Sequence, residues 1–148
     1  MRSASEASAG AQEHIITNPS NEAGLVEQIG ASDFASTLER LTAAIEGAGL
    51  QIFARIDHAA GARAIGMDML PAVVLVYGHA RGGTPIMQAC PQAALDLPLR
   101  VLVRQDEEGR TRVAFRPVGA MLRQFGVTEE LAARLEPAQR LLLGALSP

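Results

Sequence analysis

The chain has 148 residues, of which 48% are hydrophobic, and a net charge of −3. This composition suits one packed domain and excludes wholesale disorder. All 13 basic residues are arginine and aromatic residues make up 3%, so the sequence lacks the basic, aromatic-rich pattern of a nucleic-acid partner. No apolar run approaches the roughly 20 residues of a membrane-spanning helix. We therefore expect a soluble, cytoplasmic protein with no nucleic-acid and no membrane partner, and the single cysteine, Cys90, agrees with a reducing compartment.

The chain divides by composition into a leader, a domain and a tail. Residues 1–20 are predicted to be a flexible leader without the apolar segment of a secretory signal. Residues 21–126 carry alternating strand and helix patterns and are predicted to be one α+β domain. Residues 127–148 are predicted to be a C-terminal helical extension, in which Leu135, Leu141 and Leu142 form an apolar stripe left over for another surface.

The first half of the domain predicts a strand, a long helix and a second strand. Residues 25–29 suit a short strand. Ser32 is the expected N-cap of the helix, with Asp33 in its first turn. The apolar face of the helix consists of Phe34, Leu38, Leu41 and Ile45, and glycines end it at positions 47 and 49. The stretch 51–57 alternates as a strand with one strongly apolar face.

The second half predicts a central strand, a short helix and a hairpin. The apolar run 72–77 suits a strand buried on both faces. Thr84 and Pro85 are expected to cap and begin a short helix reaching about Cys90. Strands at 99–103 and 112–115 join through a loop in which Gly109 supplies a positive φ, and helical segments follow at 120–125, 128–135 and 137–146. We expect an α+β, two-layer sandwich: one long helix plus short helices on a mainly antiparallel sheet.

Asp57 and His58 close the second strand and are the first candidate site. His58 is a natural proton carrier near neutral pH, so the pair suits an enzyme with His58 as general acid or base, tuned by Asp57 or Asp96. Alternatively, Asp57 caps the next short helix and His58 is a buried, hydrogen-bonded residue. For Asp57 the capping role is favoured, whereas both alternatives for His58 stay open.

The segment 82–87, Gly-Gly-Thr-Pro-Ile-Met, is the second candidate site. Backbone N–H groups at a helix start can hold an anion, especially if His79 or Arg81 faces them. A capped helix that needs no ligand explains the same residues. Met87 and Cys90 lie on one face of this helix and, with a histidine, form an alternative soft-metal or haem site. Core packing accounts for them more simply, so we expect no metal and no cofactor.

These blocks of residues resemble the DUF302 family, whose biochemical role is largely unassigned. The resemblance runs from about residue 36 to 125 and rests on Phe53-Ala-Arg-Ile-Asp-His58, Gly83-Thr-Pro-Ile-Met87 and Asp96-Leu-Pro98. It implies a β-α-β4-α domain of the TATA-binding-protein-like kind, often a homodimer. It supplies no catalytic role for any residue.

The functional hypothesis that follows is a homodimeric domain that binds a small ligand, with an anion among the candidates. The expected pocket lies near His58 and Thr84, and its candidate ligand-binding residues are His58, Gly83, Thr84, Met87 and Asp96. The hypothesis requires that these side chains converge on one hollow.

Overall fold

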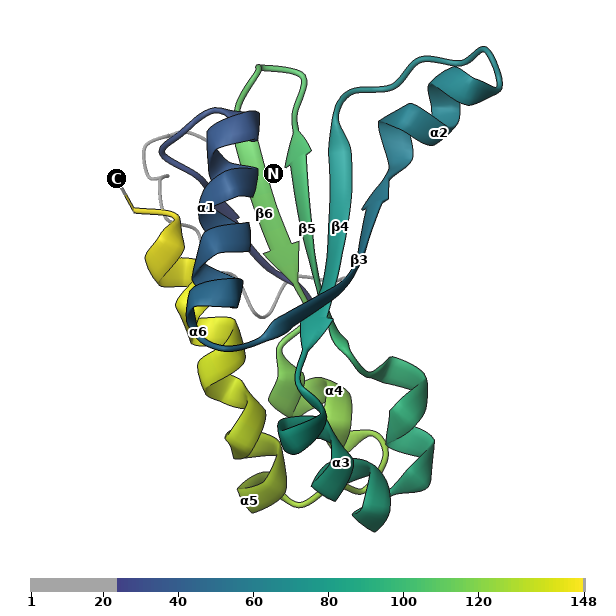
Figure 1. The fold of residues 1–148 in the computed structure, drawn as a ribbon, viewed down its shortest axis with the longest axis vertical. Helices are drawn as coiled ribbons and strands as arrows, with labels where there is room; N and C mark the ends of the chain where they lie inside the picture. The colour runs from purple at the N-terminus through teal and green to yellow at the C-terminus, as the bar shows by residue number, and fades with distance from the viewer. Residues whose placement is uncertain (1–23, 148) are drawn as a thin grey trace, which may run out of the picture.

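A computed structural model describes residues 24–147 as a twisted five-stranded sheet with helices along one side and at one end (Figure 1). The strand order is β2-β6-β5-β4-β3, and every neighbouring pair is antiparallel. The predicted α+β, two-layer class is confirmed. The strands are β2 (Val26–Ile29), β3 (Gln51–Asp57), β4 (Ala72–Gly78), β5 (Leu99–Gln105) and β6 (Thr111–Phe115).

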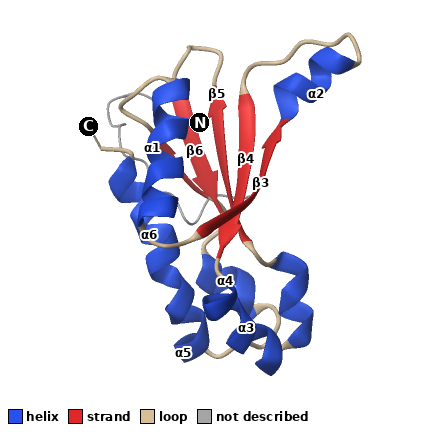
Figure 2. Cartoon of the chain, in the orientation of Figure 1, coloured by secondary structure: helices blue, strands red, loops and turns tan. Residues whose placement is uncertain are grey.

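The helices fall into three groups (Figure 2). The long helices α1 (Phe34–Gly47) and α6 (Glu136–Ala145) lie side by side along the sheet. The short helix α2 (His58–Ala64) projects from the end of β3. The remaining helices gather beyond the other end of the strands: α3 (Ala80–Ala89), the 3-10 turn η2 (Pro91–Asp96), α4 (Val118–Arg123), α5 (Glu129–Ala132) and the 3-10 turn η3 (Ala133–Leu135).

Helix α1 forms because its apolar residues recur on one face, as the sequence predicts. Leu38, Leu41 and Ile45 are buried in the core. The N-cap differs from the prediction by one residue. Asp33, rather than Ser32, is the cap, and its Oδ1 accepts a hydrogen bond from the Ser36 amide at 2.8 Å. This hydrogen bond lowers the pKa of the Asp33 carboxyl below its usual value.

Strand β4 is an inner strand of the sheet and pairs with a strand on each side. Its apolar run is buried on both faces, as predicted, although β5 rather than β4 is the middle strand of the five. Tyr77 ends this run, fully buried, and its hydroxyl donates a hydrogen bond to the Ala138 carbonyl at 2.8 Å. Burial raises the pKa of the Tyr77 hydroxyl. This hydrogen bond links the end of β4 to α6.

The C-terminal helices belong to the same core as the sheet. Leu135 and Leu142 are buried with the strand residues, and Leu141 packs against them. The expectation of a leftover apolar stripe is therefore wrong, because the chain covers this stripe itself. The side chain of Gln139 links α6 to the backbone around the start of α4. Its Oε1 accepts a hydrogen bond from the Val118 amide at 2.8 Å, and its Nε2 donates one to the Arg116 carbonyl at 2.7 Å.

The loop between β5 and β6 is organised by one buried carboxylate. Asp106 Oδ1 accepts from the amides of Glu108 and Arg110, at 3.0 and 2.9 Å. Its Oδ2 accepts from the Nε atoms of Arg110 and Arg112, at 3.2 and 2.7 Å. Burial alone would raise the pKa of Asp106, but these hydrogen bonds and positive charges lower it to about 2. Gly109 has φ +82°, as the predicted hairpin loop requires.

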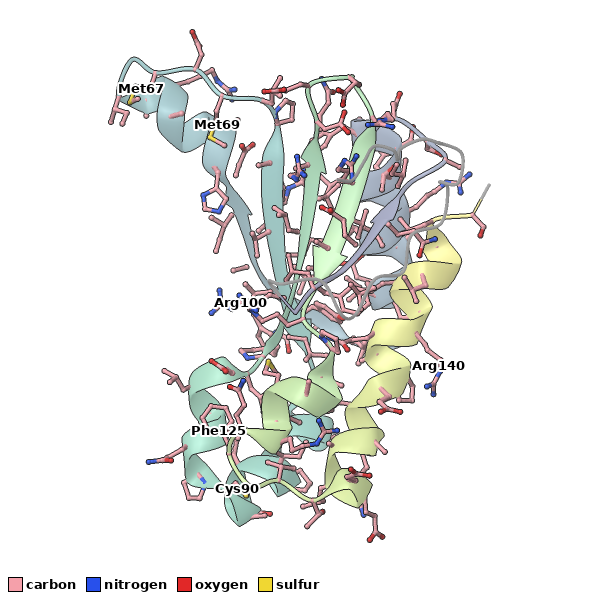
Figure 3. The ribbon with its side chains drawn as sticks, turned by 180° about the vertical axis from the view of Figure 1, so that it is seen from behind. Met67, Met69, Cys90, Arg100, Phe125 and Arg140 are labelled. Atoms are coloured by element: carbon pink, nitrogen blue, oxygen red, sulfur yellow. The ribbon has the colours of Figure 1, made fainter. Side chains whose placement is uncertain are left out.

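Strand β3 lies at the edge of the sheet and is less covered than the sequence suggests. Its predicted apolar face is only partly sheltered, since Ile56 remains 39% exposed. Beyond it, α2 and the loop to residue 70 form a projecting arm (residues 58–70), on which Figure 3 shows Met67 and Met69. No helix within residues 24–147 is both long and apolar enough to cross a membrane.

Candidate functional site

A pocket of about 740 Å³ opens where the edge of the sheet meets α3 and the C-terminal helices. We call it the α3 pocket. Its walls come from the turn before β3, the ends of β4 and η2, the first half of α3, and the segment from η3 to α6. The residues that line it are Ala48, Gly49, Leu50, Phe53, Gly78, His79, Ala80, Arg81, Gly82, Gly83, Thr84, Met87, Leu97, Pro98, Leu99, Arg134, Leu135, Pro137, Ala138 and Leu141.

Helix α3 begins five residues earlier than the sequence predicts, at Ala80 instead of Pro85. Its N-cap is His79, whose Nδ1 accepts a hydrogen bond from the Arg81 amide at 3.0 Å. Pro85, the expected first residue, lies inside the helix. The amides of Gly82 and Gly83 donate to the His79 carbonyl at 3.0 and 3.1 Å. The predicted anion site at a helix start beside Thr84 is therefore wrong, because no helix starts there and the glycine amides already have partners.

The two glycines of α3 set how closely this helix approaches its neighbours. A Cβ at position 82 would lie 3.1 Å from Leu135 Cδ2, which is tighter than ordinary contact. A Cβ at position 83 would lie 3.6 Å from Met87 Cε and 3.9 Å from Leu97 Cδ1, which is ordinary contact. Gly82 thus lets α3 and η3 touch, whereas Gly83 faces space that a side chain can enter.

Four of the lining residues carry polar side chains: His79, Arg81, Thr84 and Arg134. Because His79 Nδ1 accepts the capping bond, the proton of the neutral ring lies on Nε2, which can donate. Arg81 and Arg134 are exposed, and neither forms an ion pair within residues 24–147. The two guanidinium groups at this pocket are therefore available to an anionic ligand.

The predicted site residues do not all converge. Gly83, Thr84 and Met87 line the α3 pocket, but His58 does not. In the antiparallel pair of β3 and β4, Gln51 faces Gly78 at one end and Asp57 faces Val73 at the other. The end of β3 that leads to His58 is thus roughly 20 Å along the strands from the end that leads to α3.

His58 and Asp57 have local surroundings that differ from a catalytic pair. The Oδ1 of Asp57 accepts a hydrogen bond from the Ala60 amide at 2.9 Å, so Asp57 caps α2, as favoured from sequence. His58 is exposed, and its imidazole ring forms no hydrogen bond to any described residue. The structural alternative for His58, a buried and hydrogen-bonded ring, is therefore also wrong. The pairing of His58 with Asp57 or Asp96 that an acid–base role calls for is absent from the described residues.

Asp96 and Cys90 also lie outside the lining of the α3 pocket. Asp96 ends η2 and is half-buried. Cys90 follows α3, and its amide donates to the Ile86 carbonyl at 2.8 Å. Within residues 24–147, no three histidine, cysteine, aspartate or glutamate side chains gather as a metal site would require.

The sequence does not predict several of the lining residues. Its patterns place Phe53 on a strand face, and Arg134 and Leu141 in a separate C-terminal extension. Their approach to α3 depends on tertiary packing between segments about fifty residues apart. No local pattern singles out Arg134, because Glu130 stands four residues before it, at the spacing of a helical ion pair.

The chain resembles three curated proteins over part of their length. It is 35% identical over 89 residues to "Fluoride-specific ion channel FluC 1" of Brucella suis and of Brucella abortus, and to "Fluoride-specific ion channel FluC 2" of Brucella melitensis. The match covers 60% of this chain and 33–35% of those proteins. The chain therefore spans about a third of the length of these relatives.

The fold is shared with a solved structure. The crystal structure of an uncharacterized conserved DUF302 protein from Bacillus stearothermophilus superposes with a TM-score of 0.70 and 15% sequence identity. The match covers 82% of this chain and 94% of the other. The family model of the domain of unknown function DUF302 matches residues 27–147, which includes the tail that the sequence analysis set apart. The chain belongs to the DUF302 family.

Proposed function

We propose that this domain binds a small molecule in the α3 pocket, and that the ligand has an apolar body and an anionic group. The observation that carries the proposal is the pocket itself. Its volume of about 740 Å³ lies within the range of about 300–1,000 Å³ that is usual for small-molecule sites.

The lining favours a ligand with an apolar body. Twelve of its twenty residues are apolar, four are glycines and four carry polar side chains. Leu50 lies in the turn before β3, Phe53 in β3, Met87 in α3 and Leu141 in α6, so the apolar lining comes from several parts of the fold. Contact of a hydrocarbon body with these side chains removes apolar surface from water, which is the main driving force for such binding.

The charged groups favour an anion at one end of the ligand. Arg81 and Arg134 lack ion-pair partners within the described part of the chain and line the same hollow. A carboxylate accepts paired hydrogen bonds from a guanidinium group with high geometric specificity. Thr84 and the His79 Nε2 atom supply further donors.

The test compares a carboxylate with its neutral counterpart on the full chain. Decanoate and decanol share a hydrocarbon body and differ in the head group. We expect decanoate to raise the melting temperature more than decanol does, because only decanoate engages the guanidinium groups. In the Arg81→Gln/Arg134→Gln variant this difference should disappear, with a loss of decanoate affinity of about tenfold or more.

Two further variants separate the pocket from the rest of the surface. Gly83→Leu places a bulky side chain at the pocket wall beside Met87 and Leu97 and should abolish binding of both compounds. Arg63→Gln removes an exposed arginine outside the pocket and should leave both affinities unchanged. Equal binding by Gly83→Leu and the unmodified chain, or no binding of either compound, would contradict the proposal.

A second candidate comes from the fluoride-channel relatives. We infer that this chain corresponds to a part of those proteins that binds an anion in support of its transport. Fluoride itself suits the α3 pocket poorly, because an apolar lining cannot replace the hydration of so small an ion. A titration of the chain with fluoride, followed by the ¹⁹F line width, distinguishes fluoride from the larger ligand. If the fluoride signal broadens and Arg81→Gln removes this broadening, fluoride is favoured.

A further inference from the structure

We propose that the anionic group of the ligand in the α3 pocket is a phosphate monoester, held by Arg81 and Arg134 together. This inference rests on the proposed function and names the class of its ligand. All four polar side chains of the lining can donate hydrogen bonds, and none of the lining residues is acidic. A phosphate monoester matches such a set of donors, because it has a charge of about −1.5 to −2 at pH 7 and three strongly accepting oxygens.

The two arginines extend from parts of the backbone that lie close together. Gly82 of α3 lies against Leu135 of η3, since a Cβ at position 82 would be 3.1 Å from Leu135 Cδ2. Arg81 and Arg134 directly precede these two residues in the chain, so their long side chains begin near one another beside the same pocket. One tetrahedral group can therefore accept hydrogen bonds from both guanidinium groups.

The carboxylates nearest in the chain do not neutralise these two charges. Glu136, two residues after Arg134, pairs instead with Arg140 at 3.8 Å. No ion pair joins Glu130 to Arg134, and Arg81 likewise lacks an ion-pair partner within residues 24–147. Two unpaired positive charges in proximity repel each other, and a dianion between them offsets this repulsion more completely than a monoanion does. The charge balance of the site thus favours phosphate over carboxylate.

His79 and Thr84 add two neutral donors from the same helix. His79 caps α3 through Nδ1, so the neutral ring carries its proton on Nε2. Arg81 and Thr84 are three residues apart and therefore lie on one side of α3. The Thr84 hydroxyl has no hydrogen-bond partner among the described residues. Four donor side chains are thus available for the three oxygens of one phosphate group.

The apolar part of the lining favours an ester over free phosphate. Inorganic phosphate can use the donors, but it leaves the apolar surface of Leu50, Phe53 and Leu141 in contact with water. An ester of an apolar alcohol covers that surface, which adds a hydrophobic contribution to the binding. The ligand class is therefore a phosphate monoester with a hydrocarbon body, and both a free ester and the head group of a lipid have this chemistry.

The experiment compares the affinities of the full chain for decyl phosphate, decyl sulfate and decanoate by calorimetric titration at about pH 8. The second pKa of a phosphate monoester is about 6, so decyl phosphate is a dianion under these conditions. Decyl sulfate has the same tetrahedral shape but a single charge. We expect decyl phosphate to bind about tenfold or more tightly than either monoanion, because it alone engages both guanidinium groups fully. Inorganic phosphate should bind more weakly than decyl phosphate.

Single substitutions test whether both arginines are needed. Arg81→Gln and Arg134→Gln each leave one guanidinium group, so in each variant the affinities for decyl phosphate and decyl sulfate should come within about threefold of each other. Both side chains are exposed and form no ion pair within the described residues, so we expect both variants to fold, which circular dichroism verifies. Arg63→Gln, an exposed arginine outside the pocket, should keep the full preference for phosphate.

The outcomes separate this inference from the proposed function. Equal affinities for the three anions, all lost in Arg81→Gln/Arg134→Gln, would refute the phosphate class and leave the proposed function standing. No binding of any compound would refute both. A preference for decyl phosphate that survives both single substitutions would refute the role of the two arginines, and equal binding of inorganic phosphate would refute the ester.

Vesicles distinguish the two sources of the phosphate monoester. Sedimentation of the full chain with phosphatidylcholine vesicles that contain phosphatidic acid, if it requires Arg81 and Arg134, would identify a lipid head group. Binding of decyl phosphate without binding to these vesicles would identify a free ester.

Discussion

Replacing each of the two neighbouring glycines of α3 by alanine tests the geometry of the α3 pocket wall. Alanine in place of a helical glycine contributes about 0.5–1 kcal/mol of stability through backbone entropy. At Gly83 the new Cβ would make ordinary contacts, 3.6 Å from Met87 Cε and 3.9 Å from Leu97 Cδ1. We therefore expect Gly83→Ala to retain the full gain and to raise the melting temperature by about 1–4 °C.

Gly82→Ala brings the same gain in helix propensity but a different steric result. Its Cβ would lie 3.1 Å from Leu135 Cδ2, so the leucine must move by a few tenths of an ångström. Overpacking of this kind typically costs about 1–3 kcal/mol, and Leu135 can yield somewhat because it borders the hollow. We expect Gly82→Ala to be less stable than Gly83→Ala by at least about 0.5 kcal/mol.

The assay is urea unfolding followed by circular dichroism, with the free energy of unfolding compared among the variants. The double variant Gly82→Ala/Leu135→Val shortens the opposing side chain. The free energy of unfolding of this double variant should be higher than the two single changes predict by simple addition, because the contact that causes the penalty is gone. A Gly82→Ala variant that is more stable than Gly83→Ala would refute the described approach of α3 to η3.

Other predictions concern the buried polar groups. Folding lowers the pKa of Asp106 from 3.8 to about 2. The ionised Asp106 therefore contributes about 1–2 kcal/mol to the free energy of unfolding above the unfolded pKa, and this contribution is lost as pH falls toward 2. The urea midpoint of the Asp106→Asn variant should accordingly depend less on pH below about pH 4.5. Gln139→Leu leaves the Val118 amide without its acceptor and should lower the free energy of unfolding by about 1–3 kcal/mol. Tyr77→Phe removes the hydrogen bond to the Ala138 carbonyl and should cost about 1 kcal/mol, measured by thermal unfolding; no change would mean that water replaces this bond.

The elements with one dominant local signal were predictable from sequence. The apolar face of α1 recurs every three to four residues, and Leu38, Leu41 and Ile45 are buried as that period requires. The run in β4 contains no charged residue and forms an inner strand that is buried on both faces. In both cases burial follows from the spacing of apolar residues within one element, which can be read directly from the sequence.

The start of α3 shows why competing local signals mislead. Thr84 followed by Pro85 is a typical helix start, and two glycines before it discourage a helix. The structure instead uses the His79 ring as the cap and accommodates both glycines, because Gly82 permits close contact with Leu135. Tertiary packing outweighs a propensity difference of about 1 kcal/mol per glycine.

The position of His58 could have been deduced from the predicted topology. Residues that follow two consecutive antiparallel strands lie at opposite ends of the pair. His58 follows β3 and Thr84 comes after β4, so an antiparallel sheet separates them before any side chain is considered. The contribution of Arg134 to the pocket had no comparable rule, because it depends on how the tail folds back.

Phe53 belongs to two surfaces, since it lines the hollow beside α3 and stands exposed on the outer strand of the sheet. A ligand that rests against this ring would cover apolar surface that is otherwise open to water. Its binding would therefore be accompanied by a decrease in heat capacity, which calorimetric titrations at several temperatures would record.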